Sequence, residues 1–176
     1  MKFLESKIKG CYIIRCNIYN DERGSFAKIY NQSVFKENGI DINFNESFFS
    51  ISKKDCIRGM HFQKDPNQVK KLISCSNGKI LDVFLDIRKD SSTYGCFDSV
   101  ILSEKNSKMV LLCEGIAHGF LTLTKKSIVN YLQSGEFCKD SDSGILWNSF
   151  GFDWGVKDPI ISKRDYNLTK FSDLMV

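Results

Sequence analysis

Histidine and the usual signatures of cofactor binding are scarce in this sequence, and their scarcity narrows the possible chemistry. The chain has only two histidines. It contains no G-x-x-x-x-G-K-[ST] loop, no G-x-G-x-x-G after a β-rich run and no G-x-S-x-G motif, which argues against P-loop nucleotidases, dinucleotide-binding folds and α/β-hydrolases. Its seven cysteines include no C-x-x-C pair, so neither a disulfide scaffold nor a zinc finger is indicated.

Long apolar runs and a dominant charge are missing as well. Charged residues interrupt every apolar run in the opening segment MKFLESKIKGCYIIRC, so neither a signal peptide nor a membrane-spanning segment is predicted. The net charge of +4 is small and scattered, which does not indicate nucleic-acid binding. With 176 residues, 42% of them hydrophobic, the chain can bury a real core. We expect a single cytoplasmic domain over residues 1–176, with reduced thiols.

Short β-rich runs separated by turn residues occupy most of the chain. Turn signals that recur about every ten residues are typical of an antiparallel sandwich or barrel. We therefore predict an all-β jelly roll with a few short helices at its periphery. One helix is expected over residues 34–37 and another near residues 163–165, with Ser33 and Ser162 as their N-caps. The predicted strands are residues 72–75, 80–87, 100–102, 109–112, 119–123 and 127–132.

Two carboxylates interrupt one of these runs. Asp82 and Asp86 are four residues apart within ILDVFLDI, so they share one face of the predicted strand. That face either lines a polar cavity or faces solvent. The residues alone leave both interpretations open.

Both histidines lie in short motifs that contain glycine, R-G-M-H-F-Q at 58–63 and G-I-A-H-G-F at 115–120. On a regular strand Arg58 and His61 would face opposite ways, but a bulge at Gly59 would bring both to one pocket. Taken separately, each motif also fits an ordinary strand with a hydrogen-bonded histidine. Neither histidine has a carboxylate at a ligand-like spacing and no third histidine exists, so a metal site is not predicted.

Together these fragments resemble the dTDP-4-dehydrorhamnose 3,5-epimerases, cupin-fold enzymes of deoxysugar-nucleotide biosynthesis. The resemblance implies a cupin-type jelly roll without cofactor or metal. It implies inversion of C3, C5 or both in a nucleoside-diphosphate 4-keto-6-deoxysugar, by proton removal and return through an enolate. It also implies a homodimer. The matching motifs are D-E-R-G-S-F at 21–26, R-G-M-H-F-Q at 58–63, K-L-I at 71–73, D-V-F-L-D-I-R at 82–88, S-S-T-Y-G at 91–95, G-I-A-H-G-F at 115–120, G-I-L-W-N at 144–148 and S-K-R-D at 162–165.

The resemblance also implies roles for individual residues. His61 matches the family's base, Asp165 the carboxylate that orients it, and Lys71 the lysine that stabilises the enolate oxygen. Counting forward from His61 also allows Lys70, whereas counting back from Asp82 favours Lys71. Arg23 and Phe26 match a segment that contacts the nucleotide, often across a dimer interface. The substrate-binding residues expected on this basis are Arg23, Phe26, Lys28, Glu46, Arg58, Gln63, Asp82, His118, Tyr131, Phe137 and Cys138.

Phe137 departs from the family, which usually carries a tyrosine there that returns a proton. Phenylalanine has no proton to give. Three interpretations follow: inversion of one centre, with C3 favoured; inversion of both, with Cys138, Tyr131 or water as the acid; or sugar-nucleotide binding without turnover. Because His61, Asp165 and Lys71 are retained, loss of catalysis is the least favoured.

Two further departures concern the substrate. Lys28 and Glu46 replace the family's usual glutamate and glutamine. These changes leave the nucleotide open among dTDP, CDP and GDP, and the sugar open between a hexose and a heptose. A metal-dependent cupin is the remaining alternative.

Overall fold

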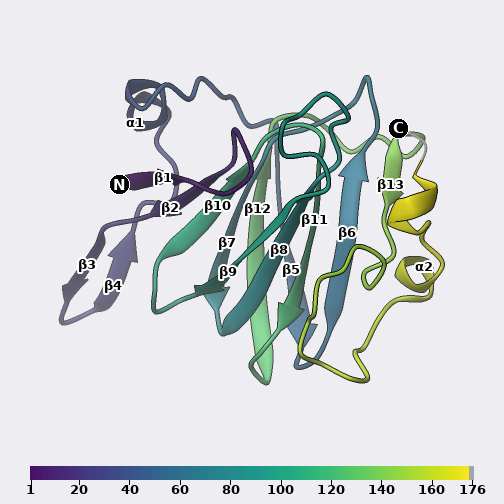
Figure 1. Cartoon of the computed structure of the whole chain (residues 1–176). Coiled ribbons are helices and arrows are strands. Elements are labelled where there is room, and N and C mark those ends of the chain that lie inside the picture. Colours follow the sequence, from purple (N-terminus) through teal and green to yellow (C-terminus); the bar gives the residue numbers. More distant parts are fainter. Residues whose placement is uncertain (175–176) are drawn as a thin grey trace.

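The computed structural model describes residues 1–174 and consists almost entirely of β-strands (Figure 1). The predicted all-β class is confirmed, and the helical elements are α1 (Gln32–Glu37), α2 (Lys163–Tyr166) and a 3₁₀ turn (Phe171–Asp173). The strands are β1 (Lys2–Glu5), β2 (Tyr12–Arg15), β3 (Ile18–Asp21), β4 (Gly24–Ala27), β5 (Glu46–Lys53), β6 (Ile57–Gln63), β7 (Lys71–Asn77), β8 (Lys79–Asp86), β9 (Phe97–Ser103), β10 (Lys108–Leu112), β11 (Ile116–Thr122), β12 (Lys126–Gln133) and β13 (Asp142–Gly144).

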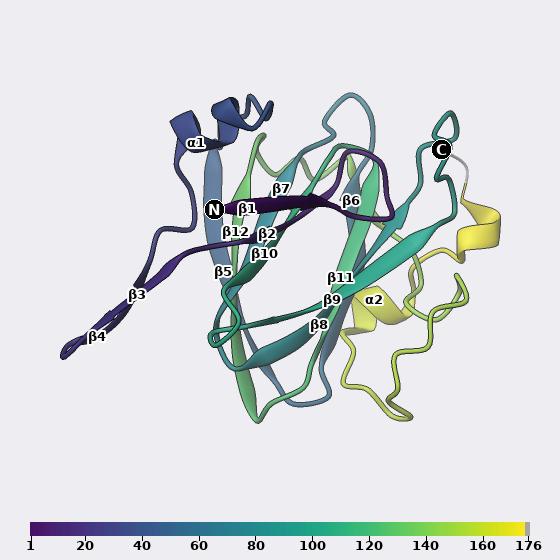
Figure 2. The ribbon, with the colours of Figure 1, turned by 60° about the vertical axis from the view of Figure 1, so that its left-hand side comes forward.

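Two sheets face each other and form a jelly-roll barrel of the cupin type (Figures 1 and 2). The first sheet has the order β1-β2-β10-β7-β12-β5, and the second has the order β13-β6-β11-β8-β9. Their inward side chains pack into one core, in which Ile73 and Val129 of the first sheet meet Phe84 and Phe120 of the second. Burial of this apolar surface holds the two sheets together.

All six predicted strands are present, most of them longer by one to three residues than the apolar runs. The face of β8 that carries Asp82 and Asp86 points into the barrel, because Ile80 and Phe84 on the same face belong to the core between the sheets. Both carboxylates are fully buried. The solvent-facing interpretation of these two residues is therefore wrong.

Of the two interpretations left open for the motif around Gly59, the register between β6 and β11 shows the bulge. His118 pairs with His61 and Phe120 pairs with Arg58, so three steps along β6 oppose two steps along β11. Gly59 has φ of +135°, and a Cβ there would lie 2.4 Å from the Cα of Gly119. Only glycine allows the two backbones to approach so closely. The extra residue places Arg58 and His61 on the same side of the strand.

The C-terminal segment covers the outer face of the second sheet. Ile145, Phe150 and Trp154 pack there against Met60 and Leu85. After this apolar cover the chain returns to β6, where it forms α2 against that strand.

Of the two predicted helix N-caps, one is present in the structure and the other is not. Ser162 caps α2 as predicted, since its side chain accepts a hydrogen bond from the Asp165 N–H. The predicted cap of α1 is wrong. Asn31, not Ser33, caps that helix by accepting from the Val34 N–H, and α1 begins at Gln32. An asparagine two residues earlier competes successfully because Asn is at least as good an N-cap as Ser.

The hairpin β3–β4 projects away from the barrel (Figures 1 and 2). Every residue of β4 is exposed, and Tyr19 and Phe26 each keep 62% of their surface accessible. Among residues 1–174 no helix is long and apolar enough to cross a membrane.

Candidate active site

A cavity of about 250 Å³ lies between the two sheets and opens to solvent. One wall comes from β6 and β11 of the second sheet, and the other comes from β5, β7 and β12 of the first. Residues from the loop after β12, from β13 and from α2 complete the rim. The lining residues are Phe48, Ser50, Arg58, His61, Phe62, Gln63, Lys71, His118, Tyr131, Gln133, Phe137, Asp142 and Arg164.

His61 on β6 is paired with the buried Asp165 of α2. The His61 Nε2 lies 2.8 Å from the Asp165 Oδ1, and the Gly59 N–H donates to Oδ2 at 3.2 Å. Burial raises the pKa of Asp165, but the hydrogen bonds and charge of His61 and the Gly59 N–H outweigh it and hold that pKa below its usual value. Asp165 is therefore a carboxylate that only accepts, so Nε2 of His61 carries the proton and Nδ1 is free to act as a base.

His118 on β11 is the direct cross-strand neighbour of His61. Its Nε2 lies 2.7 Å from Oδ2 of Asp82, which is fully buried behind it on β8. Desolvation raises the pKa of Asp82, against the opposing effect of His118. Each of the two histidines is thus oriented by its own buried carboxylate. The histidines themselves lie on two neighbouring strands of the same wall.

A polar row crosses the opposite wall. Gln133 of β12 is paired in register with Lys71 of β7 on one side and with Glu46 of β5 on the other. Burial lowers the pKa of Lys71 to about 8, although Asp142 and Glu46 counter this by favouring the charged form. Lys70 points elsewhere and lies 3.6 Å from a carboxylate oxygen of Glu114. Of the two lysines, Lys71 is the one in the cavity.

Aromatic side chains frame the mouth. Tyr131 is buried and stacks on Phe48 with ring centroids 4.7 Å apart, whereas Phe137 is 60% exposed. Burial raises the pKa of the Tyr131 phenol, which keeps it protonated. Glu46 holds the loop of Phe137 in place, since its Oε2 accepts from the Phe137 N–H at 3.0 Å and from Gln133 Nε2 at 3.1 Å.

The predicted site residues fall into four groups. His61, Lys71, Arg58, Gln63, His118, Tyr131 and Phe137 line the cavity, and Asp165, Asp82 and Glu46 support them from behind or from the rim. Cys138 does not line the cavity: its N–H donates to Gln63 Oε1 at 2.6 Å, so it anchors the rim. Arg23, Phe26 and Lys28 lie outside the cavity of their own chain, because the hairpin that carries the first two projects from the barrel.

Six lining residues were not among the predicted site residues: Phe48, Ser50, Phe62, Gln133, Asp142 and Arg164. Gln133 lies two residues after Tyr131 on one strand, and Arg164 precedes Asp165, so both had a detectable signal. Arg164 donates to Asp142 Oδ2 at 2.7 Å across the rim. Ser50 and Asp142 depend on how distant strands pair, and no local pattern marks them.

The arrangement suits proton transfer on a small polar molecule. A histidine base held by a carboxylate faces a protonated phenol and an ammonium on the opposite wall, and the cavity between them is open to solvent. Within residues 1–174 no group of three or more His, Cys, Asp or Glu side chains could hold a metal ion. Fold and site together define a cupin-type barrel whose cavity carries groups suited to acid–base chemistry.

Comparisons with known proteins identify the family. The sequence model of the dTDP-4-dehydrorhamnose 3,5-epimerases matches residues 5–173. The enzyme of that name from Methanothermobacter thermautotrophicus is 40% identical, with 94% of this chain and 92% of the relative covered. The chain belongs to the dTDP-4-dehydrorhamnose 3,5-epimerase family, and it is an epimerase.

Solved structures agree with this assignment. The dTDP-4-dehydrorhamnose 3,5-epimerase of Bacillus anthracis, solved with TDP and pyrophosphate bound, superposes with a TM-score of 0.93 at 37% identity and covers 96% of this chain and 98% of its own. A 3′-monoepimerase from Streptomyces bikiniensis in complex with dTDP-quinovose gives a TM-score of 0.90 at 25% identity, with 95% and 86% covered. Relatives on this fold thus include enzymes named for two centres and for one.

Proposed function

We propose that this protein epimerises a nucleoside-diphosphate 4-keto-6-deoxysugar, with His61 as the base and inversion at C3 alone. The observation that carries the proposal is the opposition of His61 and Tyr131 on facing walls of one cavity, with Lys71 on the side of Tyr131. Inversion requires that a proton leave from one face of the carbon and return to the other. Two opposed proton-transfer groups meet this requirement.

The proposed reaction uses residues of this chain only. The C4 carbonyl acidifies the C3 proton, which His61 Nδ1 removes while Asp165 stabilises the imidazolium that forms. Lys71 donates a hydrogen bond to the developing enolate oxygen, which lowers the barrier electrostatically. Tyr131 then returns a proton to C3 from the opposite face, and the two groups re-equilibrate with solvent. Arg58 and Arg164 supply positive charge for the diphosphate.

Restriction to C3 is proposed from Phe137. Its ring stands at the mouth of the cavity and carries no hydroxyl, so the rim lacks a proton donor at this position. Tyr131 is then the one phenol in the lining set, and it serves one carbon. The relative from Streptomyces bikiniensis named as a 3′-monoepimerase supports single-centre chemistry on this fold.

The same proposal includes a homodimer. The projecting hairpin with Arg23 and Phe26 has no role in its own cavity, and exposed apolar residues continue along the outer face of β5 at Phe49 and Ile51. A second copy would cover this surface and receive the hairpin beside its nucleotide.

Deuterium wash-in tests the proposal. Incubation in D₂O with dTDP-, CDP- and GDP-linked 4-keto-6-deoxyhexoses, followed by NMR, should show exchange at C3 and none at C5 with one of them. His61→Ala should lower exchange by about two to four orders of magnitude. Exchange at C5 would refute the restriction to C3, and absence of exchange at both carbons with every nucleotide would refute catalysis on this substrate class.

A further inference from the structure

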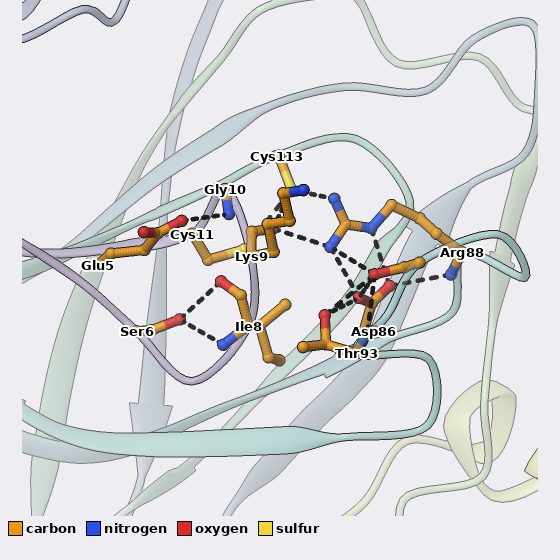
Figure 3. Close-up of polar contacts among 11 residues, drawn as sticks. Glu5, Ser6, Ile8, Lys9, Gly10, Cys11, Asp86, Arg88, Thr93 and Cys113 are labelled. Carbon is orange, nitrogen blue, oxygen red and sulfur yellow. Dashed lines mark hydrogen bonds and ion pairs between the residues drawn. The ribbon is translucent and has the colours of Figure 1, made fainter.

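A second polar cluster lies outside the active-site cavity, where three turns of the barrel meet (Figure 3). These turns are residues 6–11 between β1 and β2, residues 87–96 after β8, and residues 113–115 between β10 and β11. None of the clustered side chains lines the cavity. The proposed reaction does not use them, so their arrangement needs its own explanation.

Asp86 fixes Arg88 at the centre of this cluster. The fully buried Asp86 carboxylate accepts from the Arg88 backbone N–H at 3.0 Å, from its Nε at 2.8 Å and from its Nη2 at 2.7 Å. Ser91 and Thr93 donate to the same carboxylate at 2.7 and 2.6 Å. Burial raises the pKa of Asp86, but these hydrogen bonds outweigh it and lower that pKa to about 2. A permanent carboxylate therefore holds the guanidinium in one orientation.

The remaining donor of Arg88 points at a thiol. Its Nη1 lies 3.1 Å from Cys113 Sγ, while Nη2 also donates to the Lys9 carbonyl at 2.9 Å (Figure 3). Cys113 Sγ in turn lies 3.6 Å from Cys11 Sγ, and both thiols are free. Cys113 is half-buried and can meet a small solute, whereas Cys11 is fully buried behind it.

The two thiols differ in acidity. The hydrogen bond from Cys11 lowers the pKa of Cys113, the charge of Arg88 assists it, and partial burial opposes both. The same hydrogen bond and burial raise the pKa of Cys11. The thiolate is therefore favoured at Cys113, and Cys11 is placed to act as the resolving thiol.

The backbone is shaped for close approach of the two cysteines. Gly10, the residue before Cys11, adopts φ of +81°, a left-handed conformation that favours glycine. The turn of Cys11 is fixed by hydrogen bonds from Cys11 N–H to the Ile8 carbonyl and from Ser6 N–H to the Cys11 carbonyl. The sulfur atoms are thus held in contact by ordered turns.

We propose that Cys11 and Cys113 form a modification site that hydroperoxides oxidise to a reversible intramolecular disulfide. The Cys113 thiolate attacks one peroxide oxygen, an S–O bond forms, the O–O bond breaks, and protonation of the leaving oxygen gives water or an alcohol. Cys11 then attacks the sulfenic sulfur, an S–S bond forms, and hydroxide leaves as water with the Cys11 proton. The two thiols lose two electrons in total and the peroxide gains them.

Peroxide treatment of the full chain tests this site. The native protein is exposed to hydrogen peroxide, free thiols are alkylated, and the product is digested without reductant and mapped by mass spectrometry. We expect a peptide that links Cys11 to Cys113 and disappears after dithiothreitol. Oxidation of Cys96 or Cys138 at doses that leave both Cys11 and Cys113 alkylated would overturn the proposal.

Variants separate the two thiol roles. Cys11→Ser should abolish the linked peptide and leave Cys113 as a sulfenic acid that dimedone traps, whereas Cys96→Ser, which removes an exposed thiol, should leave the yield of linked peptide unchanged. Dimedone labelling of Cys11 in a Cys113→Ser variant at the rate seen for Cys113 would refute the assigned order. If either core variant fails to fold, the wild-type peptide map still decides whether the disulfide forms.

Discussion

At the scale of single residues, burial sets the protonation of two side chains that the proposed mechanism uses. Lys71 has a pKa lowered to about 8, while burial raises the pKa of Tyr131 above its usual value. At neutral pH the lysine is charged and the phenol is protonated. Both groups are then in the form that the proposed mechanism requires, as a donor to the enolate and as an acid.

The alkaline limb of the pH profile should therefore belong to Lys71. We expect kcat/KM to fall as the pH rises through about 8, because the neutral amine stabilises an enolate less than the ammonium does. Lys71→Arg keeps its charge to high pH, so its limb should move upward even though its absolute rate is lower. An unmoved limb in this variant would assign the titration to another group.

Phe137 offers a gain-of-function test. Phe137→Tyr places a phenol at the mouth and should add deuterium exchange at C5 to the exchange at C3, measured by NMR in D₂O. Phe48→Tyr is the matched control, since Phe48 also lines the mouth but is stacked on Tyr131. C5 exchange in the control alone, or in neither variant, would contradict the role given to residue 137.

Residue placement could be predicted where a motif carried it. The cavity holds His61, Arg58, His118 and Lys71, which the family resemblance implied as site residues. Ser50 could not be predicted, because its position depends on the pairing of β5 with β12, far along the chain. Pairing of this kind is fixed by the packed sheets and leaves no local pattern.

At the scale of elements, the bulged pairing of β6 with β11 positions His61, the proposed base. A Cβ at Gly119 would lie 2.8 Å from both the Arg58 carbonyl oxygen and the Met60 Sδ. We expect Gly119→Ala to cost about 1–3 kcal/mol in urea unfolding. Because the strand must shift beneath Arg58 and His61, kcat should fall as well.

Gly39→Ala is the control for this element. A Cβ at Gly39 meets no atom within 4 Å, although φ there is +77°. This variant should lose about 1 kcal/mol from the left-handed backbone alone and keep its kcat. Equal losses of kcat in both variants would show that the bulged pairing of β6 with β11 does not position the site.

The elements themselves were largely predictable from the sequence. Apolar runs between turn residues indicated the strands from β7 to β12, because alternation and turn chemistry are local properties. The hairpin β3–β4 was not predicted as a strand pair, since its residues are exposed and show no buried face. The bulge at Gly59 was only one of two interpretations of its motif, because glycine marks a position of close backbone approach but also fits an ordinary strand.

At the scale of the whole molecule, the chain combines an interior cavity with the projecting hairpin β3–β4. The barrel holds His61, Lys71 and Tyr131, whereas Arg23 and Phe26 lie on the hairpin β3–β4 outside it. We expect light scattering to report a dimer. Phe49→Asp, on the exposed outer face of β5, should shift the protein toward the monomer, and an unchanged dimer would place the interface elsewhere.

In the proposed dimer, the projecting hairpin should allow two differently defective chains to complement each other. A chain with Arg23→Ala and Phe26→Ala keeps an intact barrel, and a chain with His61→Ala keeps an intact hairpin β3–β4. Each should be nearly inactive alone, yet random re-association of equal amounts should restore about a quarter of the wild-type rate, because half the dimers are mixed and one of their two sites is complete. If mixing restores no activity, each hairpin β3–β4 acts at the cavity of its own chain. Two defective alleles could in this way rescue each other within one cell.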